Sequence, residues 1–289
     1  MKLANHPLLL ILLLSVLLRA QGPTPLAGTG PLTLPAQPGK ALAPIDLTGY
    51  WVPLITEDWR FRMLTPRKGD YNSVPLNAEG KRVADQWDPA KDEAAHEQCK
   101  SYAAPALMRV PGRVHVTWQD DNTLKIEMDN GQQTRLFHFG LSKPADGKSA
   151  SGAPTWQGDS AATWHWPGDG RVLEARGALG LQSAGAVGSL PPFANAPQPP
   201  QGKPTTGSLT VVTTHLRPGY LRKNGVPYSA NAVLTEYYDL SKEKNGDQWL
   251  TITTIVDDPQ YLEVPFITST HFRKEADGSK WAPEPCSAR

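Results

Sequence analysis

The stretch from Gly207 to Arg273 contains four segments in which apolar and polar residues alternate, and this pattern constrains the fold most. The segments are Gly207–Leu216, Val233–Leu240, Gln248–Val256 and Phe266–Arg273. Strict alternation is typical of strands that bury one face. Asn224-Gly225 and Asn245-Gly246 mark turns between them, which favours antiparallel pairing.

Further strands are predicted upstream of this block. They are Arg113–Gln119, Leu124–Met128, Thr134–Phe139 and Ala161–Trp166. Asn130-Gly131, between the second and third of them, is a strong hairpin signal. We therefore expect an all-β, mostly antiparallel domain, either a lipocalin-like barrel or a curved sandwich, with one or two short helices.

The expected helices are identified by their N-terminal capping residues. Asn77 is the predicted N-cap of a helix over Asn77–Trp87, and Asp88 with Pro89 starts a second one that runs to about Lys100. The preceding stretch, Glu57–Arg62, alternates charged and aromatic residues, which suits a strand or an interfacial loop. Its two carboxylates fit surface ion pairs with Arg60 and Arg62 better than acid/base chemistry.

The N-terminal region indicates export. Residues 1–20 resemble a signal peptide, because the apolar run Leu8–Leu18 is about half as long as a spanning helix. The alternative is an uncleaved anchor. Residues 21–45 are rich in Pro and Gly and are interpreted as a disordered tether. We expect one β-rich domain over 46–289, with a flexible insertion at about 177–207, and no stable membrane span after cleavage.

The charge balance and the cysteines exclude several classes. The chain has 289 residues, with Lys+Arg 29, Asp+Glu 28 and a formal net charge of +1, which argues against a nucleic-acid partner. Two cysteines cannot form a four-cysteine zinc site. In a secreted or periplasmic protein, Cys99 and Cys286 are expected to form a disulfide. No cofactor is implied.

Several short motifs are spread over most of Asp46–Cys286. They are Asp46–Trp51, Glu57–Arg60, Thr65-Pro66, Lys68–Asp70, Cys99, Pro111–Arg113, Asp129–Gly131, Gln157–Ser160, Gly225–Ser229, Leu234–Glu236 and Asp258–Tyr261. As a set they resemble a family of uncharacterised secreted bacterial β-rich proteins, which implies secretion and a single β-rich domain. Wider relatives carry His-Ser where this chain has Tyr228-Ser229. The shorter motif Gly49-Tyr50-Trp51 resembles the start of lipocalin-type barrels, in which the tryptophan closes one end.

Histidines on the predicted strands are the candidates for chemistry. In a barrel, inward positions from separate strands converge, so the histidines at 138, 165, 215 and 271 are candidate metal ligands. His215, Glu236 and His271 are candidate catalytic residues. The alternative, which we favour, is that each histidine is separately hydrogen-bonded or solvated.

Aromatic side chains on the strands either fill a core or line an apolar pocket. Trp164 and Tyr238 are the candidates for a pocket wall, although core packing suits each one singly. Arg217, Tyr220 and Arg222 follow a predicted strand and could hold a carboxylate at the barrel rim, or lie in a solvated loop.

Three functions remain open from the sequence. The first is a secreted binding protein that holds a small, largely apolar ligand in a barrel cavity. The second is a secreted enzyme that uses the His/Glu cluster, with or without a metal. The third is a structural or interaction module with a filled core.

Overall fold

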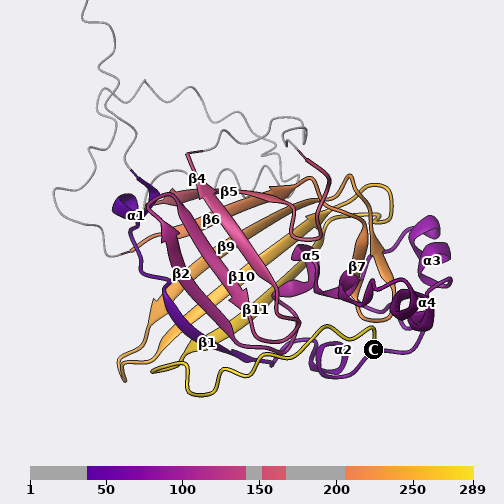
Figure 1. Ribbon diagram of the computed structural model, residues 1–289, viewed down its shortest axis with the longest axis horizontal. Helices are drawn as coiled ribbons and strands as arrows, with labels where there is room; N and C mark the ends of the chain where they lie inside the picture. Colours follow the sequence, from indigo (N-terminus) through magenta and orange to yellow (C-terminus); the bar gives the residue numbers. More distant parts are fainter. Residues whose placement is uncertain (1–37, 141–151, 167–205) are drawn as a thin grey trace, which may run out of the picture. The chain divides into compact units, whose positions relative to one another are not determined.

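The strands form a closed barrel, which confirms the predicted all-β class. In the computed structural model, the described residues are 38–140, 152–166 and 206–289. Their strands close in the order β1-β11-β10-β9-β6-β5-β4-β3-β2 (Figure 1). The bounds are β1 Gly49–Leu54, β2 Val114–Asp120, β3 Thr123–Met128, β4 Thr134–Phe139, β5 Asp159–His165, β6 Ser208–Thr214, β9 Val233–Lys242, β10 Gln248–Asp257 and β11 Phe266–Lys274. Among these described barrel strands, β4 and β5 are the one pair that runs parallel.

The register of the strands follows from the turns that join them. β9 and β10 pair continuously from Val233↔Asp257 to Lys242↔Gln248. The turn between them contains Gly246, at a φ of 90° that favours glycine. β2 and β3 form a second tight hairpin, with a register shift between Trp118 and Asp120. The alternating segments are therefore the strands that the sequence predicted.

Inward-facing side chains fill the interior of the barrel. One apolar cluster collects the alternate residues of every barrel strand, because successive side chains point to opposite faces. Trp51, Phe137 and Phe272 are among its fully buried members. Trp51 donates its indole N–H to the Leu47 carbonyl at 2.9 Å, so its polar atom is satisfied.

The segment just before β1 belongs to the folded domain, which corrects the expected start of the domain at residue 46. Helix α1, Gly39–Leu42, lies beside β5. The Gly39 carbonyl accepts a hydrogen bond from the Trp164 indole at 2.8 Å, and Ala43 and Ile45 are buried in the apolar cluster. The predicted tether thus ends before these residues, which have enough apolar contacts to be ordered.

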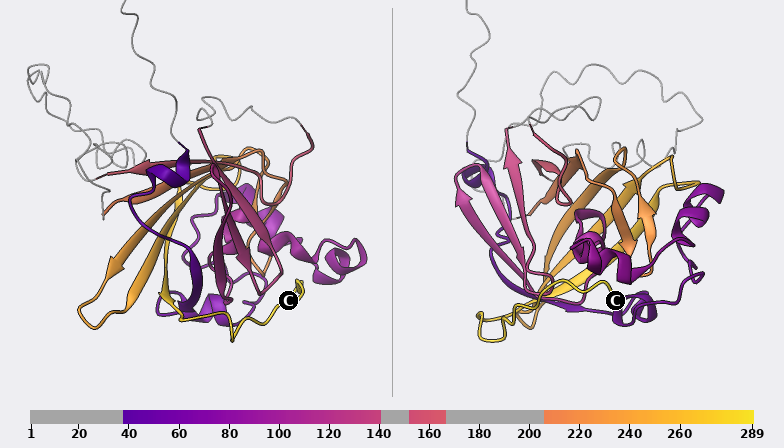
Figure 2. Two further views of the ribbon diagram at one scale, coloured as in Figure 1. Left: turned by 60° about the vertical axis from the view of Figure 1, so that its left-hand side comes forward. Right: turned by 45° about the vertical axis from the view of Figure 1, so that its right-hand side comes forward.

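Short helices and a small hairpin gather at the other end of the barrel from α1 (Figures 1 and 2). They are α2 Trp59–Met63, α3 Ala78–Ala84, α4 Pro89–Ala94, η1 Gln98–Tyr102 and α5 Ala104–Leu107, with the hairpin β7 Gly219–Arg222 and β8 Val226–Tyr228. A second apolar cluster joins α3, α5 and the hairpin to the strand ends. The predicted caps are present: Asn77 accepts from the Gly80 N–H at 2.8 Å and Asp88 from the Ala90 N–H at 3.1 Å.

Residues 57–62 do not form the predicted strand or loop, because 59–63 form helix α2. Of the predicted ion pairs, Arg62 with Glu57 is formed. Arg60 instead pairs with Asp70, and Asp58 pairs with Arg109 at 3.0 Å. In a helix, residues three to four apart lie on one face. The alternation of charged and aromatic residues was interpreted with the period of a strand, so the prediction for this stretch was wrong.

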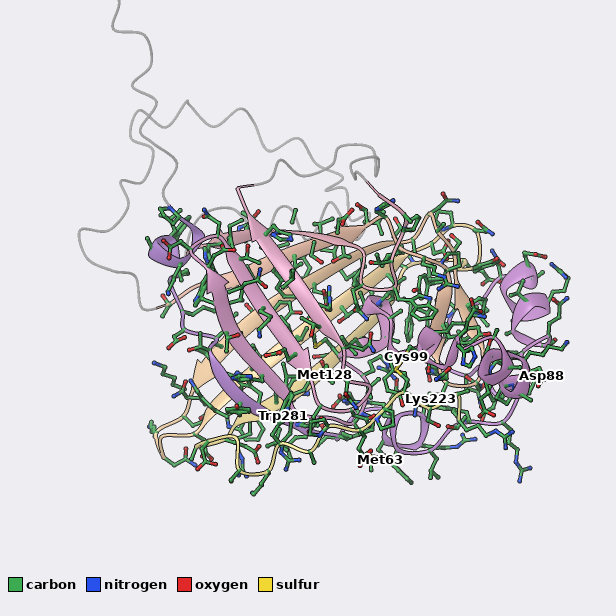
Figure 3. The ribbon with its side chains drawn as sticks, viewed as in Figure 1. Met63, Asp88, Cys99, Met128, Lys223 and Trp281 are labelled. Carbon is green, nitrogen blue, oxygen red and sulfur yellow. A yellow bond between two sulfur atoms is a disulfide. The ribbon has the colours of Figure 1, made fainter. Side chains whose placement is uncertain are left out.

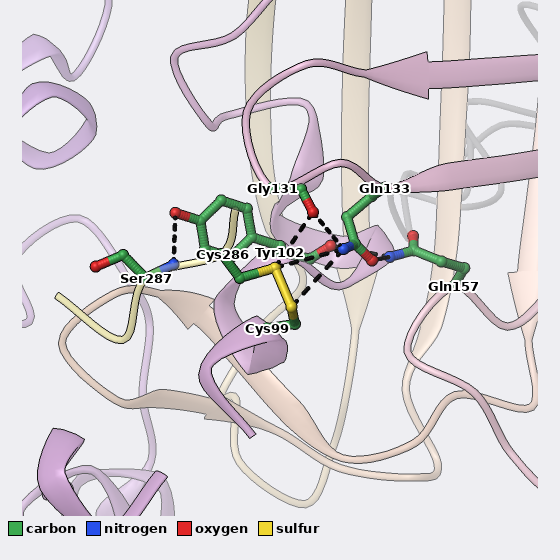
Figure 4. Close-up of a disulfide and its surroundings, with 7 residues drawn as sticks. All are labelled: Cys99, Tyr102, Gly131, Gln133, Gln157, Cys286 and Ser287. Carbon is green, nitrogen blue, oxygen red and sulfur yellow. Dashed lines mark hydrogen bonds between the residues drawn. A yellow bond between two sulfur atoms is a disulfide. The ribbon is translucent and has the colours of Figure 1, made fainter. Parts of the chain in front are cut away.

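The predicted disulfide is formed between Cys99 in η1 and Cys286 near the C-terminus (Figure 4). The Cα atoms are 5.2 Å apart. Gln133, just before β4, donates from its side-chain amide to Cys286 Sγ at 3.4 Å, and the Tyr102 hydroxyl accepts from the Ser287 N–H at 3.3 Å. The bridge therefore ties the C-terminal segment to the helical end of the barrel.

Some predictions concern segments outside the described residues. These are the signal peptide at 1–20, residues 21–37 of the tether and residues 177–205 of the insertion. Within the described part of the chain, no helix is long and apolar enough to span a membrane.

Candidate functional site

The candidate metal ligands do not come together in the barrel interior, which corrects the proposed cluster. His138, His165 and His271 alternate with core residues on β4, β5 and β11, so they lie on the outer face. His138 Nδ1 lies 3.4 Å from the Thr123 hydroxyl, and His271 Nδ1 lies 3.4 Å from Glu57. No group of three or more His, Cys, Asp or Glu among the described residues is arranged to hold a metal ion.

His215 leaves the alternation of its strand. It follows β6 with a φ of 57°, and its ring lies 3.0 Å from the Asp159 carboxylate at the surface. The inward positions of β6 are Leu209, Val211 and Thr213. The left-handed backbone at His215 interrupts the alternation of side chains along the strand. His215 therefore does not lie on the inward face that these three residues share.

Glu236 is the one catalytic candidate that faces the interior, and it is fully buried. Arg135 holds it through two hydrogen bonds of 2.6 and 2.9 Å. Burial disfavours the charged guanidinium, but attraction to Glu236 outweighs this and raises the pKa of Arg135. With the carboxylate enclosed by this pair and by the Tyr238 hydroxyl at 3.3 Å, Glu236 has a structural role and no access to substrate.

The sequence-predicted ligand residues fall into two groups. Trp164 and Tyr238 are buried core residues, 5% and 2% exposed. Arg217 pairs with Glu97, and the Tyr220 hydroxyl donates to Asp92 at 2.9 Å. Arg222 ends β7 and is 4% exposed. The two groups do not form one site, because the first lies within the strands and the second belongs to the helical end.

The barrel has a hollow at its α1 end, where the core filling stops. The hollow measures about 700 Å³, and its apolar wall is made by Ala43, Pro44, Ile45, Trp118 and Leu240. Trp118 and Leu240 face inward from the ends of β2 and β9 and are only half-buried. Lys40, Asp46 and Lys242 add charged groups around it. A volume of this size is typical of small-molecule pockets, which measure about 300–1,000 Å³.

Comparison with known protein families, curated proteins and solved structures finds no match. The resemblance to secreted bacterial β-rich proteins therefore stays a prediction. The function must be argued from the residues of this chain.

Sequence reasoning missed most of the wall of the hollow for an identifiable reason. Ala43, Pro44 and Ile45 fell within the predicted tether, because a Pro-rich composition masks a short packed segment. The alternation of β2 places Trp118 on the same face as Val114 and Val116. The sequence does not show that the packed core stops before Trp118, which is why its place in the wall was missed.

Proposed function

We propose that this protein is an exported binding protein that holds a small, largely apolar ligand at the α1 end of its barrel. The observation that carries the proposal is that Trp118 and Leu240 face inward yet remain half-exposed around a hollow of about 700 Å³. Elsewhere in the described barrel the inward positions are packed with side chains. The ligand therefore binds at the mouth, whereas the sequence suggested the lumen.

The chemistry of the wall defines the ligand class. An aromatic ring and several aliphatic groups favour an apolar body, since burial of apolar surface contributes about 25 cal/mol per Å². Lys40 and Lys242 line the same hollow and suit a polar end of the ligand. Export to the periplasm or beyond is supported by the Cys99–Cys286 disulfide, because such bonds persist in oxidising compartments.

The enzyme hypothesis has less support. It required His215, Glu236 and His271 to share one cavity, and these residues lie apart. An interaction module without a ligand is the remaining alternative, and the binding experiment separates it from the proposal.

The test is a titration of the full disulfide-bonded chain with the apolar fluorescent probe N-phenyl-1-naphthylamine. We expect saturable binding that weakens about tenfold in Trp118→Ala, because the ring supplies much of the apolar contact. Trp249→Ala is the matched control, since Trp249 lies on β10 at a position that alternates with the core residue Leu250. Binding that is equally strong in Trp118→Ala overturns the site, and absence of saturable binding favours the interaction module.

A further inference from the structure

Three arginines converge at the helical end of the barrel, away from the proposed ligand hollow. Arg62 comes from α2, Arg109 follows α5, and Arg222 ends β7. They are 7%, 6% and 4% exposed. Together they line a cavity of about 30 Å³ beside the labelled residue Lys223 (Figure 3). Burial of three guanidinium groups around one cavity is unusual, because charged side chains are rarely buried without partners.

The carboxylates nearby do not balance this charge. Asp58 pairs with Arg109 at 3.0 Å and lies 4.0 Å from Arg222. Glu57 pairs with Arg62, and it also lies 3.4 Å from His271. Asp70 also acts on Arg222 electrostatically, but it is paired with Arg60, so three carboxylates serve four guanidinium groups at this end of the barrel.

The cost of burying these charges lowers the pKa of two of the guanidinium groups. Burial, followed by repulsion from Arg109, lowers the pKa of Arg222 to about 10. Burial lowers the pKa of Arg62 to about 10 as well, although Glu57 partly offsets it. The cluster thus holds more positive charge than its own acidic groups stabilise.

Among the residues that the structure describes, several N–H donors of the cluster have no acceptor and are buried. They are Arg62 Nη2, Arg109 Nη1, Arg222 Nε and Arg222 Nη2. Two further donors of the cluster bind backbone carbonyls: Arg62 Nε donates to the Arg109 carbonyl at 3.0 Å and Arg222 Nη1 to the Asn72 carbonyl at 2.6 Å. A buried donor without a partner carries the full cost of its lost hydration, so a set of four indicates that a further group belongs here.

We propose that this cavity binds a compact oxyanionic group, the phosphate or carboxylate of a small molecule. Guanidinium forks match the oxygens of such groups with paired hydrogen bonds. The walls between the arginines include Phe61, Val110 and Leu221, which limit access of water and strengthen each charged contact. The Arg222 guanidinium lies 4.2 Å above the centre of the Phe61 ring, which fixes its plane.

The size and opening of the cavity fit a single head group. A volume of about 30 Å³ exceeds what one water needs and excludes a large ligand. Leu64 lines the cavity and is 66% exposed, so the opening lies on this side. The site does not depend on the proposed function, since it shares no residue with the hollow at the α1 end.

The test measures thermal unfolding of the full oxidised chain with inorganic phosphate, with acetate, and with chloride at matched ionic strength and pH 7. We expect phosphate or acetate to raise Tm in a saturable way beyond the effect of chloride. The two salts distinguish a phosphate site from a carboxylate site. A Tm that is the same in all three salts overturns the proposal and means that water alone occupies the cavity.

Variants of the chain then test whether the oxyanion-specific rise in Tm depends on this arginine cluster. Arg222→Gln should abolish the oxyanion-specific rise in Tm, whereas Arg60→Gln, a change on the exposed side of α2, should preserve it. Because Arg222→Gln can also impair folding, Leu64→Glu and Leu64→Gln form a second pair at an exposed position. Leu64→Glu should weaken oxyanion binding about tenfold through charge repulsion at the opening, and Leu64→Gln should not. Equal binding in both Leu64 variants, or a retained effect in Arg222→Gln, contradicts the proposal.

Discussion

Arg135 and Glu236 form an ion pair across the interior of the barrel, with Nη2 of the arginine 2.6 Å from Oε2 of the glutamate. Their strands, β4 and β9, are not neighbours, because β5 and β6 lie between them. Both side chains have an exposed fraction of 0%. The Thr213 hydroxyl accepts a further hydrogen bond from Arg135 at 3.1 Å. The pair therefore links two strands of the wall that are not neighbours in the sheet.

Removal of one partner of this pair should be costly. Glu236→Gln leaves a buried guanidinium without its counter-charge, so we expect a loss of about 3–5 kcal/mol in the free energy of unfolding. Guanidinium chloride denaturation measures it, with the exposed change Glu263→Gln as the control at about 0.5 kcal/mol or less. The double change Arg135→Met with Glu236→Leu should recover most of the loss. A small effect of Glu236→Gln alone would mean that water reaches the pair.

The Cys99–Cys286 bridge should stabilise the fold by restricting the unfolded chain. It closes a separation of 187 residues, for which the chain-entropy model gives about 5 kcal/mol as an upper value. We expect Cys99→Ser with Cys286→Ser to lower the denaturation midpoint. A thiol titration of unfolded, unreduced protein should find no reactive thiol. Two thiols per chain would contradict the bridge.

Ile45 tests whether the segment before β1 is part of the domain. Its side chain is 8% exposed in the apolar cluster, so Ile45→Ala should lower the free energy of unfolding by about 2–4 kcal/mol. In a disordered tether the same change would have almost no effect. Urea denaturation distinguishes the two outcomes, with Ala41→Gly as a check on the exposed side of α1.

Tyr220 should contribute to alkaline unfolding. Burial, with a further contribution from Asp92, raises the pKa of Tyr220 to about 12 from an ordinary value of 10.0. The folded state keeps the phenol protonated longer than the unfolded state, so its contribution to stability is complete below pH 10 and is lost as the pH rises toward 12. Tyr220→Phe should flatten the decline in stability over this window. Parallel pH profiles for the wild type and the variant would contradict the assignment, and Tyr261→Phe serves as the control.

The strands could be predicted from sequence because their alternation is a local property. Asn130-Gly131 and Asn245-Gly246 indicated hairpin turns, and Asn77 indicated the start of a helix. Helix α2 could not be predicted, because residues 57–62 alternate in polarity while their tertiary partners Asp70 and Arg109 favour a helix.

The sites were harder to predict because they depend on which face of each strand turns inward. His138 shares one face of β4 with Leu136. The other face points into the barrel, because it carries the fully buried Phe137. Arg135 lies on the same inward face as Phe137, although charged side chains are rarely buried. Arg222 was selected as a ligand residue from its neighbours in sequence. Its partners Arg62 and Arg109 come from distant segments, so only the fold shows the cluster.

The central claim, a ligand at the α1 end of the barrel, is tested most directly by the indole N–H resonances of the tryptophans in a two-dimensional NMR titration with the apolar probe. Trp118 lines the hollow, whereas Trp249 lies on the opposite face of β10 from the core. We expect the Trp118 resonance to shift in a saturable way while that of Trp249 stays in place. A titration that shifts Trp249 and leaves Trp118 unchanged would contradict it.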